Sequence, residues 1–103
     1  MDKVIRDGKV AVLTSPGDGA GWYTWNTYKE LLFHPRLVEL VELKRRDEIT
    51  SELVQEITGI EGVYTGGAEQ LIITWLPEGT AFRVEEYDGS ETLILLEDLH
   101  LTA

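Results

Sequence analysis

Two Asp-Gly pairs constrain the fold of this chain most strongly, because each lies beside short runs of β-forming residues. Both central positions of a tight hairpin turn require positive φ, which Asp and Gly tolerate. Asp7-Gly8 therefore predicts two antiparallel strands, at about residues 3–6 and 9–14. Asp88-Gly89 predicts a second hairpin, so β structure is expected on both sides of the middle of the chain.

The middle of the chain carries helix signals. Thr27-Tyr28-Lys29-Glu30 matches a capping box, in which the Thr hydroxyl and the Glu carboxylate each satisfy a backbone N–H. This helix is expected to stop near His34-Pro35, because the residue before proline avoids the α region. Proline suits the first position of a helix, so a second helix is expected from there, with Glu42 paired to Arg46 on its exposed face.

A third helix is expected to follow, with Asp47 as its N-cap and Gly59 as its terminator. Beyond a second glycine-rich loop, residues 71–76 have the composition of a strand. A turn is expected at Pro77-Glu78-Gly79, because proline presets φ at the second position of a turn and glycine accepts the left-handed position.

The last third of the chain continues as β structure. Residues 81–87 alternate between apolar and polar side chains, which places Phe82 and Val84 on one face of a strand. Residues 92–96 form the next expected strand, and residues 99–101 a short edge strand. The order β-β-α-α-α-β-β-β predicts one α+β domain over residues 1–103. We expect an antiparallel sheet of about five strands with two or three helices packed on one face.

Charge is distributed unevenly along the chain, whose formal net charge is −10. Residues 1–46 hold eight Lys or Arg and six Asp or Glu, whereas residues 47–103 hold one Arg and thirteen acids. A protein that binds duplex nucleic acid needs cations to neutralise phosphates, so direct binding of that kind is not expected. The acidic part could instead attract a basic protein surface.

The sequence lacks cysteine and long apolar runs. It has no cysteine, which fits a reducing cytoplasm and leaves no thiolate for a metal site. Its first residues have no apolar run typical of a signal peptide, and its longest apolar runs are far shorter than a membrane helix. We expect a cytoplasmic protein without a membrane partner.

Glycine and aromatic residues are concentrated in residues 15–26. Glycine lets a backbone approach a ligand closely, and a flat ring can stack on a planar group. Residues 64–67 form a second loop of similar composition, and the two loops would make a cleft if they met at one edge of the sheet. The candidate ligand-binding residues are Gly17, Asp18, Gly19, Gly21, Trp22, Tyr23, Thr24, Trp25, Asn26, Tyr64, Thr65, Gly66 and Gly67.

The first loop lies between a strand and a helix, as a phosphate-binding loop does. It lacks the Gly-Lys-Ser/Thr sequence of such loops, and Asp18 would repel a phosphate. Trp22 and Trp25 leave two interpretations open. Their rings either form a platform for a ligand or seal the end of the sheet as part of the core.

Patterns typical of catalysis or metal binding are weak. His34 and His100 are the only histidines, and neither lies at ligand spacing from the other. Ser15, Ser51 and Ser90 have no spacing that demands a nucleophilic triad. We expect no cofactor, no metal and no catalytic residue, and binding in preference to catalysis.

Four segments carry a resemblance to known proteins: residues 10–13, 19–26, 64–68 and 85–91. With them the chain resembles the short orphan proteins common in bacteriophage and prophage genomes. That group has no named activity, so the resemblance assigns no catalytic residue. Some small phage proteins block host defence, either by sequestering nucleotide signals or by occluding basic surfaces of defence complexes, and the resemblance implies these two roles.

The sequence thus predicts a non-enzymatic binding protein, a phage accessory or counter-defence factor that holds a small, nucleotide-like ligand through its glycine and aromatic loop. The alternative is an acidic interaction module or inhibitor that binds a basic partner surface. A homodimer is also expected, because small α+β domains often pair their sheets or sheet edges.

Overall fold

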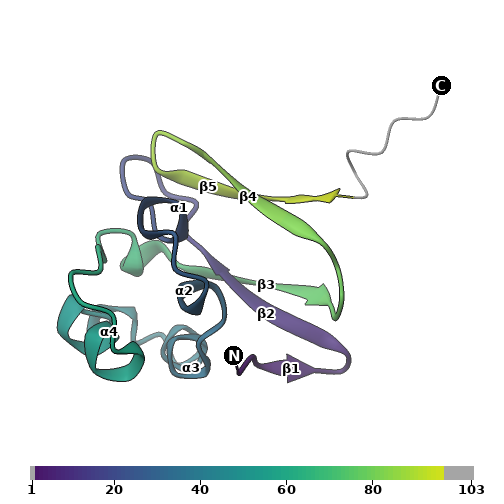
Figure 1. The fold of residues 1–103 in the computed structure, drawn as a ribbon, viewed down its shortest axis with the longest axis horizontal. Helices are drawn as coiled ribbons and strands as arrows, with labels where there is room; N and C mark the ends of the chain where they lie inside the picture. Colours follow the sequence, from purple (N-terminus) through teal and green to yellow (C-terminus); the bar gives the residue numbers. More distant parts are fainter. Residues whose placement is uncertain (1, 97–103) are drawn as a thin grey trace.

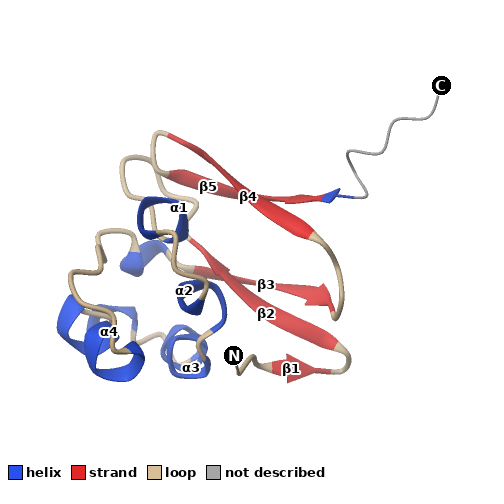
Figure 2. Cartoon of the chain, in the orientation of Figure 1, coloured by secondary structure: helices blue, strands red, loops and turns tan. Residues whose placement is uncertain are grey.

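Helices fill the middle of the chain and strands flank them in the computed structural model, which describes residues 2–96 (Figures 1 and 2). The strands are β1 (Ile5–Arg6), β2 (Lys9–Thr14), β3 (Ile72–Pro77), β4 (Phe82–Tyr87) and β5 (Ser90–Leu95). The helices are α1 (Tyr23–Asn26), α2 (Glu30–Phe33), α3 (Pro35–Glu42) and α4 (Ser51–Thr58), with 3-10 turns at Arg46–Glu48 and Ala68–Gln70. The predicted α+β class and element order are confirmed, with α1 as an additional short helix. The strand expected at residues 99–101 lies outside the described residues.

The five strands form two antiparallel sheets in place of the single sheet expected. One sheet has the order β1-β2-β3, and β4 pairs with β5 as a separate hairpin. Figure 1 shows this hairpin on the side of β2 and β3 away from α3 and α4. β5 approaches β2 just beyond the end of that strand, where the Glu91 N–H donates to the Ser15 carbonyl at 2.8 Å.

The turns were predicted correctly because their backbone conformation is a local property. Asp7 and Gly8 have φ of 51° and 75°, and Asp88 and Gly89 have φ of 52° and 86°. Positive φ at both central positions is what a tight hairpin turn requires. Gly59, with φ of 77°, ends α4 as expected.

Two helix caps were predicted wrongly. Thr27 does not open a capping box: it adopts a left-handed conformation with φ of 66° and ends α1, donating its N–H to the Tyr23 carbonyl at 2.6 Å. A residue in that conformation cannot also be the extended N-cap of the next helix. At α4 the cap is Thr50, whose Oγ1 accepts the Leu53 N–H at 3.1 Å, whereas Asp47 lies inside the preceding 3-10 turn.

The ion pair expected on α3 also differs. Glu42 accepts two hydrogen bonds from Arg6, at 2.5 and 2.8 Å. It therefore connects α3 to β1 and does not pair with Arg46. Arg46 Nε instead donates to the Leu71 carbonyl at 2.8 Å. Pro35 is the first residue of α3 as predicted, and His34 Nδ1 caps that helix by accepting the Arg36 N–H.

The core lies on both faces of β2, which is buried from Val10 onward. Ala11 and Leu13 belong to a cluster shared with α3 and α4. Val10 and Val12 face the other way and pack with residues of α2 and of the hairpin. The central sheet is therefore covered by helices on one face and by α2 and the β4–β5 hairpin on the other.

Candidate functional site

The two glycine-rich loops lie in contact, a point that the sequence alone did not decide. Asn26 Nδ2 donates to the Tyr64 carbonyl and the Tyr64 N–H donates to Asn26 Oδ1, each at 2.9 Å. The rings of Trp25 and Tyr64 lie 5.2 Å apart between centroids, tilted by 40°. We call this region, formed by Ser15, residues 17–26, residues 64–67 and Glu91, the loop junction.

The glycines of the loop junction are packed against groups of the chain itself. A Cβ added to Gly67 would lie 2.5 Å from the Gly21 carbonyl oxygen, and one added to Gly21 would lie 2.6 Å from the Trp25 ring. A Cβ on Gly66 would overlap the Tyr64 phenol, and one on Gly17 the side chain of Gln70. The close approach that glycine permits is therefore used within the protein at these four positions.

A buried carboxylate holds the first loop in place. Glu91 is 3% exposed, and its Oε1 accepts the Ser15 N–H at 3.0 Å. Its Oε2 accepts the N–H groups of Trp22 and Thr24, at 3.1 and 2.7 Å, and the Thr24 hydroxyl at 2.7 Å. Four donors replace the water that a charged group would otherwise keep, which is how a buried carboxylate is satisfied without a cation.

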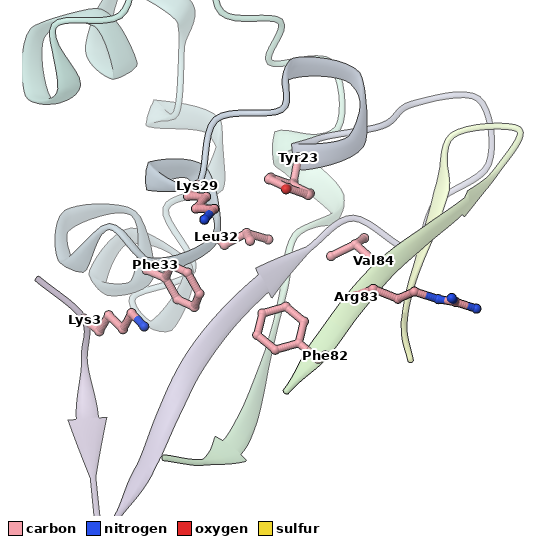
Figure 3. A pocket seen from close by; sticks show the side chains of 8 residues that line it. All are labelled: Lys3, Tyr23, Lys29, Leu32, Phe33, Phe82, Arg83 and Val84. Carbon is pink, nitrogen blue, oxygen red and sulfur yellow. The ribbon is translucent and has the colours of Figure 1, made fainter. Parts of the chain in front are cut away.

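The aromatic residues of the first loop have different positions. Trp22 is 0% exposed, and its Nε1 donates to the Leu31 carbonyl at 2.8 Å, so its ring is part of the core. Trp25 is 45% exposed and covers Gly21. Tyr23 is half-buried and points into a separate cleft (Figure 3).

The remaining predicted site residues lie around the loop junction. Asp18 is exposed and, with Glu85 and Glu86, borders a shallow depression of about 400 Å³. The Gly19 N–H donates to the Asp88 carbonyl at 2.5 Å, which joins the first loop to the β4–β5 turn. Thr65 is half-buried, and its carbonyl accepts the Ala68 N–H at 3.0 Å.

An open cleft of about 640 Å³ lies between the helices and the hairpin (Figure 3). Of the residues predicted from sequence as a site, only Tyr23 lines it. The lining residues are Lys3, Tyr23, Lys29, Leu32, Phe33, Phe82, Arg83 and Val84. We refer to this space as the cleft.

Two elements, α2 and β4, place four side chains of the cleft. Leu32 and Phe33 project from the short helix α2, and Phe82 and Val84 project from β4 on the face that its alternation predicts. The Phe33 and Phe82 rings lie edge to face, with centroids 6.3 Å apart. This edge-to-face geometry is favourable for aromatic pairs.

Two lysines give the cleft its charge. Lys3 Nζ lies 4.4 Å from the centroid of the Phe33 ring, a cation–π contact, and Lys29 precedes α2. Neither lysine forms an ion pair with another residue in the range 2–96. Arg83 differs, because its side chain points away from the cleft and pairs with Glu85 at 2.6 Å (Figure 3).

Shifted pKa values occur at two exposed ion pairs outside the cleft. A hydrogen bond from Arg6, aided by its charge and opposed by desolvation, lowers the pKa of Glu42. A hydrogen bond from Arg45 is likewise the main cause that lowers the pKa of Glu48, and the Arg45 charge adds to it while desolvation opposes it. Both carboxylates belong to surface ion pairs and neither lines the cleft.

Sequence reasoning missed Glu91 and most of the cleft. Glu91 shares an alternating face with Leu93 and Leu95, and a carboxylate on an apolar face was the signal for a buried polar network. The alternation of β4 located Phe82 and Val84 on one face, but no local pattern connects them to Lys3.

In the described part of the chain, no group of three or more His, Asp or Glu side chains could hold a metal ion. No helix within residues 2–96 has both the length and the apolar character needed to cross a bilayer.

Comparison of the chain with protein-family models, with curated proteins and with solved structures found no match.

Proposed function

We propose that this protein binds a small anionic ligand that carries a planar ring, such as a nucleotide, in the cleft. The observation that supports this most directly is the combination, around one open volume, of three aromatic rings with two lysines that have no ion-pair partner within residues 2–96. The proposal keeps the ligand class expected from the sequence and moves its site from the loop junction to the cleft.

The aromatic lining would recognise the ring. Tyr23, Phe33 and Phe82 come from α1, α2 and β4, so a planar group entering between them would meet side chains from opposite walls. A base that stacks on an aromatic side chain gains roughly 1–3 kcal/mol. The cleft volume of about 640 Å³ lies within the range of small-molecule sites, roughly 300–1,000 Å³.

The lysines would recognise the charge. An anion is repelled at long range by a chain of net charge −10, so its binding requires cations placed at the site itself. Lys3 and Lys29 supply them at the rim of an apolar lining, where an ion pair is less screened than on an open surface. Affinity should therefore fall as salt is added.

A calorimetric and thermal-shift screen tests this proposal with AMP, ADP and cyclic dinucleotides as probes. A ligand present at 100 times its Kd stabilises the native state by about 2.7 kcal/mol, so a rise in Tm is expected for at least one probe. Adenosine and ribose 5-phosphate are the matched controls, because each lacks one of the two recognised features, and both should bind more weakly.

Variants locate the binding site. Phe82→Ala and Lys29→Gln should each weaken binding at least several-fold, whereas Lys44→Gln, which removes a lysine that does not line the cleft, should leave it unchanged. The proposal fails if no probe raises the Tm. It also fails if a probe binds the Phe82→Ala and Lys29→Gln variants as tightly as the wild type.

A second candidate function is binding of a basic protein surface. Asp18, Glu85 and Glu86 border the shallow depression beside Tyr87, whose side chain is 83% exposed. An exposed tyrosine among carboxylates is typical of an interaction surface for a cationic partner. In an affinity capture experiment the wild type should retain a basic protein that a Tyr87→Ala variant does not, and added salt should release it.

For either candidate, the resemblance to phage proteins suggests a biological setting. Sequestering a nucleotide signal would use the cleft, whereas occluding a basic surface of a defence complex would use the acidic depression. The two settings are distinguished by the same binding experiments.

A further inference from the structure

The outer edge of β3 is a second feature that the proposed ligand site does not use. β3 pairs with β2 on one side only, with Thr74 opposite Val12. The ladder continues past the strand, where the Glu78 N–H donates to the Gly8 carbonyl at 2.8 Å. Residues with even numbers therefore bond to β2, and the backbone groups of Ile73 and Trp75 face outward.

Both ends of this edge are already closed. The Leu71 carbonyl accepts Arg46 Nε at 2.8 Å, and the Leu71 N–H donates to the Ala68 carbonyl at 3.3 Å. At the other end Pro77 has no N–H, and its carbonyl accepts the Thr80 N–H at 3.0 Å. Within residues 2–96, this leaves the N–H and C=O groups of Ile73 and Trp75 as the open part of the edge.

Between its two closed ends, the edge lacks the usual protection against pairing. Natural edge strands carry charged side chains, bulges or covering segments that prevent another strand from adding. Residues 71–77 contain no charged residue, and Ile72 is 43% exposed. An uncharged edge with four open backbone groups is suited to the addition of one more strand.

We infer that the strand added is β3 of a second copy, so that two three-stranded sheets join antiparallel into one of six strands. With Ile73 opposite the partner's Trp75, the two-fold axis passes beside Thr74, and four hydrogen bonds satisfy all the open groups of both copies. The edge is therefore complementary to itself in this register.

Neighbouring registers satisfy fewer groups. Placing Ile73 opposite the partner's Ile73 would put Trp75 opposite the partner's Leu71, whose groups are already bonded. Placing Trp75 opposite the partner's Trp75 would put Ile73 opposite the partner's Pro77, which has no N–H to donate. The ends of the strand thus select one register.

The side chains agree with that register. Ile73 would lie beside the partner's Trp75, an aromatic and β-branched pair of the kind that stabilises antiparallel strands, and Thr74 would lie beside the partner's Thr74. Arg46, held at Leu71, would come near the partner's Glu78, which follows Pro77. This opposite-charge pair would form twice, once on each side of the axis.

Charge substitution at the axis tests the inference by sedimentation, with protein concentrations raised to the millimolar range. Thr74→Lys and Thr74→Glu each place two like charges side by side across the axis, so each variant alone should remain a monomer where the wild type dimerises. A mixture of the two should form a heterodimer. Thr92→Lys, on an exposed position of β5, is the matched control and should dimerise as the wild type does.

Amide hydrogen exchange gives a readout that needs no variant. The Ile73 and Trp75 amides should exchange more slowly as the wild-type concentration rises, while the Thr74 amide, which bonds to β2, should not depend on concentration. A wild type that stays monomeric, or concentration-independent exchange at Ile73 and Trp75, would overturn the inference. So would dimers that persist in both Thr74 variants or a mixture that stays monomeric.

Discussion

At the loop junction, glycines and aromatic rings pack against one another around the Glu91 carboxylate, whereas at the cleft aromatic rings from three elements stand around an open volume. The difference lies in what fills the space beside the backbone. Glycine has no side chain, and at Gly21 and Gly66 an aromatic ring of the same loop occupies the space that a side chain would take. The cleft stays open because its walls belong to separate elements, α2 and β4.

The largest effect is expected when the charge at the centre of the loop junction, the Glu91 carboxylate, is removed. Glu91→Gln puts an NH2 group among backbone N–H donors, so at least one buried donor loses its acceptor. We expect the free energy of unfolding to fall by about 3 kcal/mol, measured by chemical denaturation.

Glu85→Gln on the neighbouring strand is the control for this prediction. Glu85 is exposed and pairs with Arg83, so its substitution should change the free energy of unfolding by no more than about 0.5 kcal/mol. Equal effects of the two substitutions would mean that the carboxylate of Glu91 does not hold the first loop.

The two tryptophans of the first loop differ in burial, so their substitution should differ in its effect on stability. Trp22→Phe removes the hydrogen bond to the Leu31 carbonyl and leaves unfilled space in the core, so a loss of about 2–4 kcal/mol is expected in chemical denaturation. Trp25→Phe changes a ring that is 45% exposed, and should cost less than about 1 kcal/mol. A larger loss for Trp25 than for Trp22 would contradict the division of the motif into a buried and an exposed part.

Features governed by one or two residues could be predicted from the sequence. The Asp7-Gly8 and Asp88-Gly89 turns depend on φ alone, and Pro35 starts α3 because its φ is fixed. The capping box failed because Thr27 was needed to end α1, a helix that the glycine-rich composition had concealed. A local signal was thus overridden by the element before it.

Features that depend on distant contacts could not be predicted in this way. The sheet is split because β5 forms a backbone hydrogen bond beside β2 only beyond the end of that strand, at Ser15, and no pattern within either strand specifies this. The cleft joins Lys3 to Phe82 across most of the chain. The meeting of the two loops was likewise open until the reciprocal hydrogen bonds of Asn26 and Tyr64 decided it.

The smallest effect on stability is expected at Glu42, a carboxylate that is paired with an arginine, whereas Glu91 is held by neutral donors. Arg6 lowers the pKa of Glu42 in the folded state, chiefly through its hydrogen bonds. A carboxylate with a depressed pKa contributes stability above its unfolded pKa, and that contribution is lost as pH falls through its folded pKa. The wild type should therefore lose slightly more stability on acidification than an Arg6→Gln variant does.

An NMR titration of the Glu42 carboxyl carbon measures this directly. In the wild type its pKa should lie below the ordinary value of a glutamate, and in the Arg6→Gln variant it should rise toward that value. The effect on unfolding should be small, because the side chains of Arg6 and Glu42 are 55% and 31% exposed and water screens their charges. If Arg6→Gln left the Glu42 pKa unchanged, the ion pair between β1 and α3 would be absent in solution. Glu42 would then have no partner that fixes its carboxylate, unlike Glu91, which accepts backbone N–H groups.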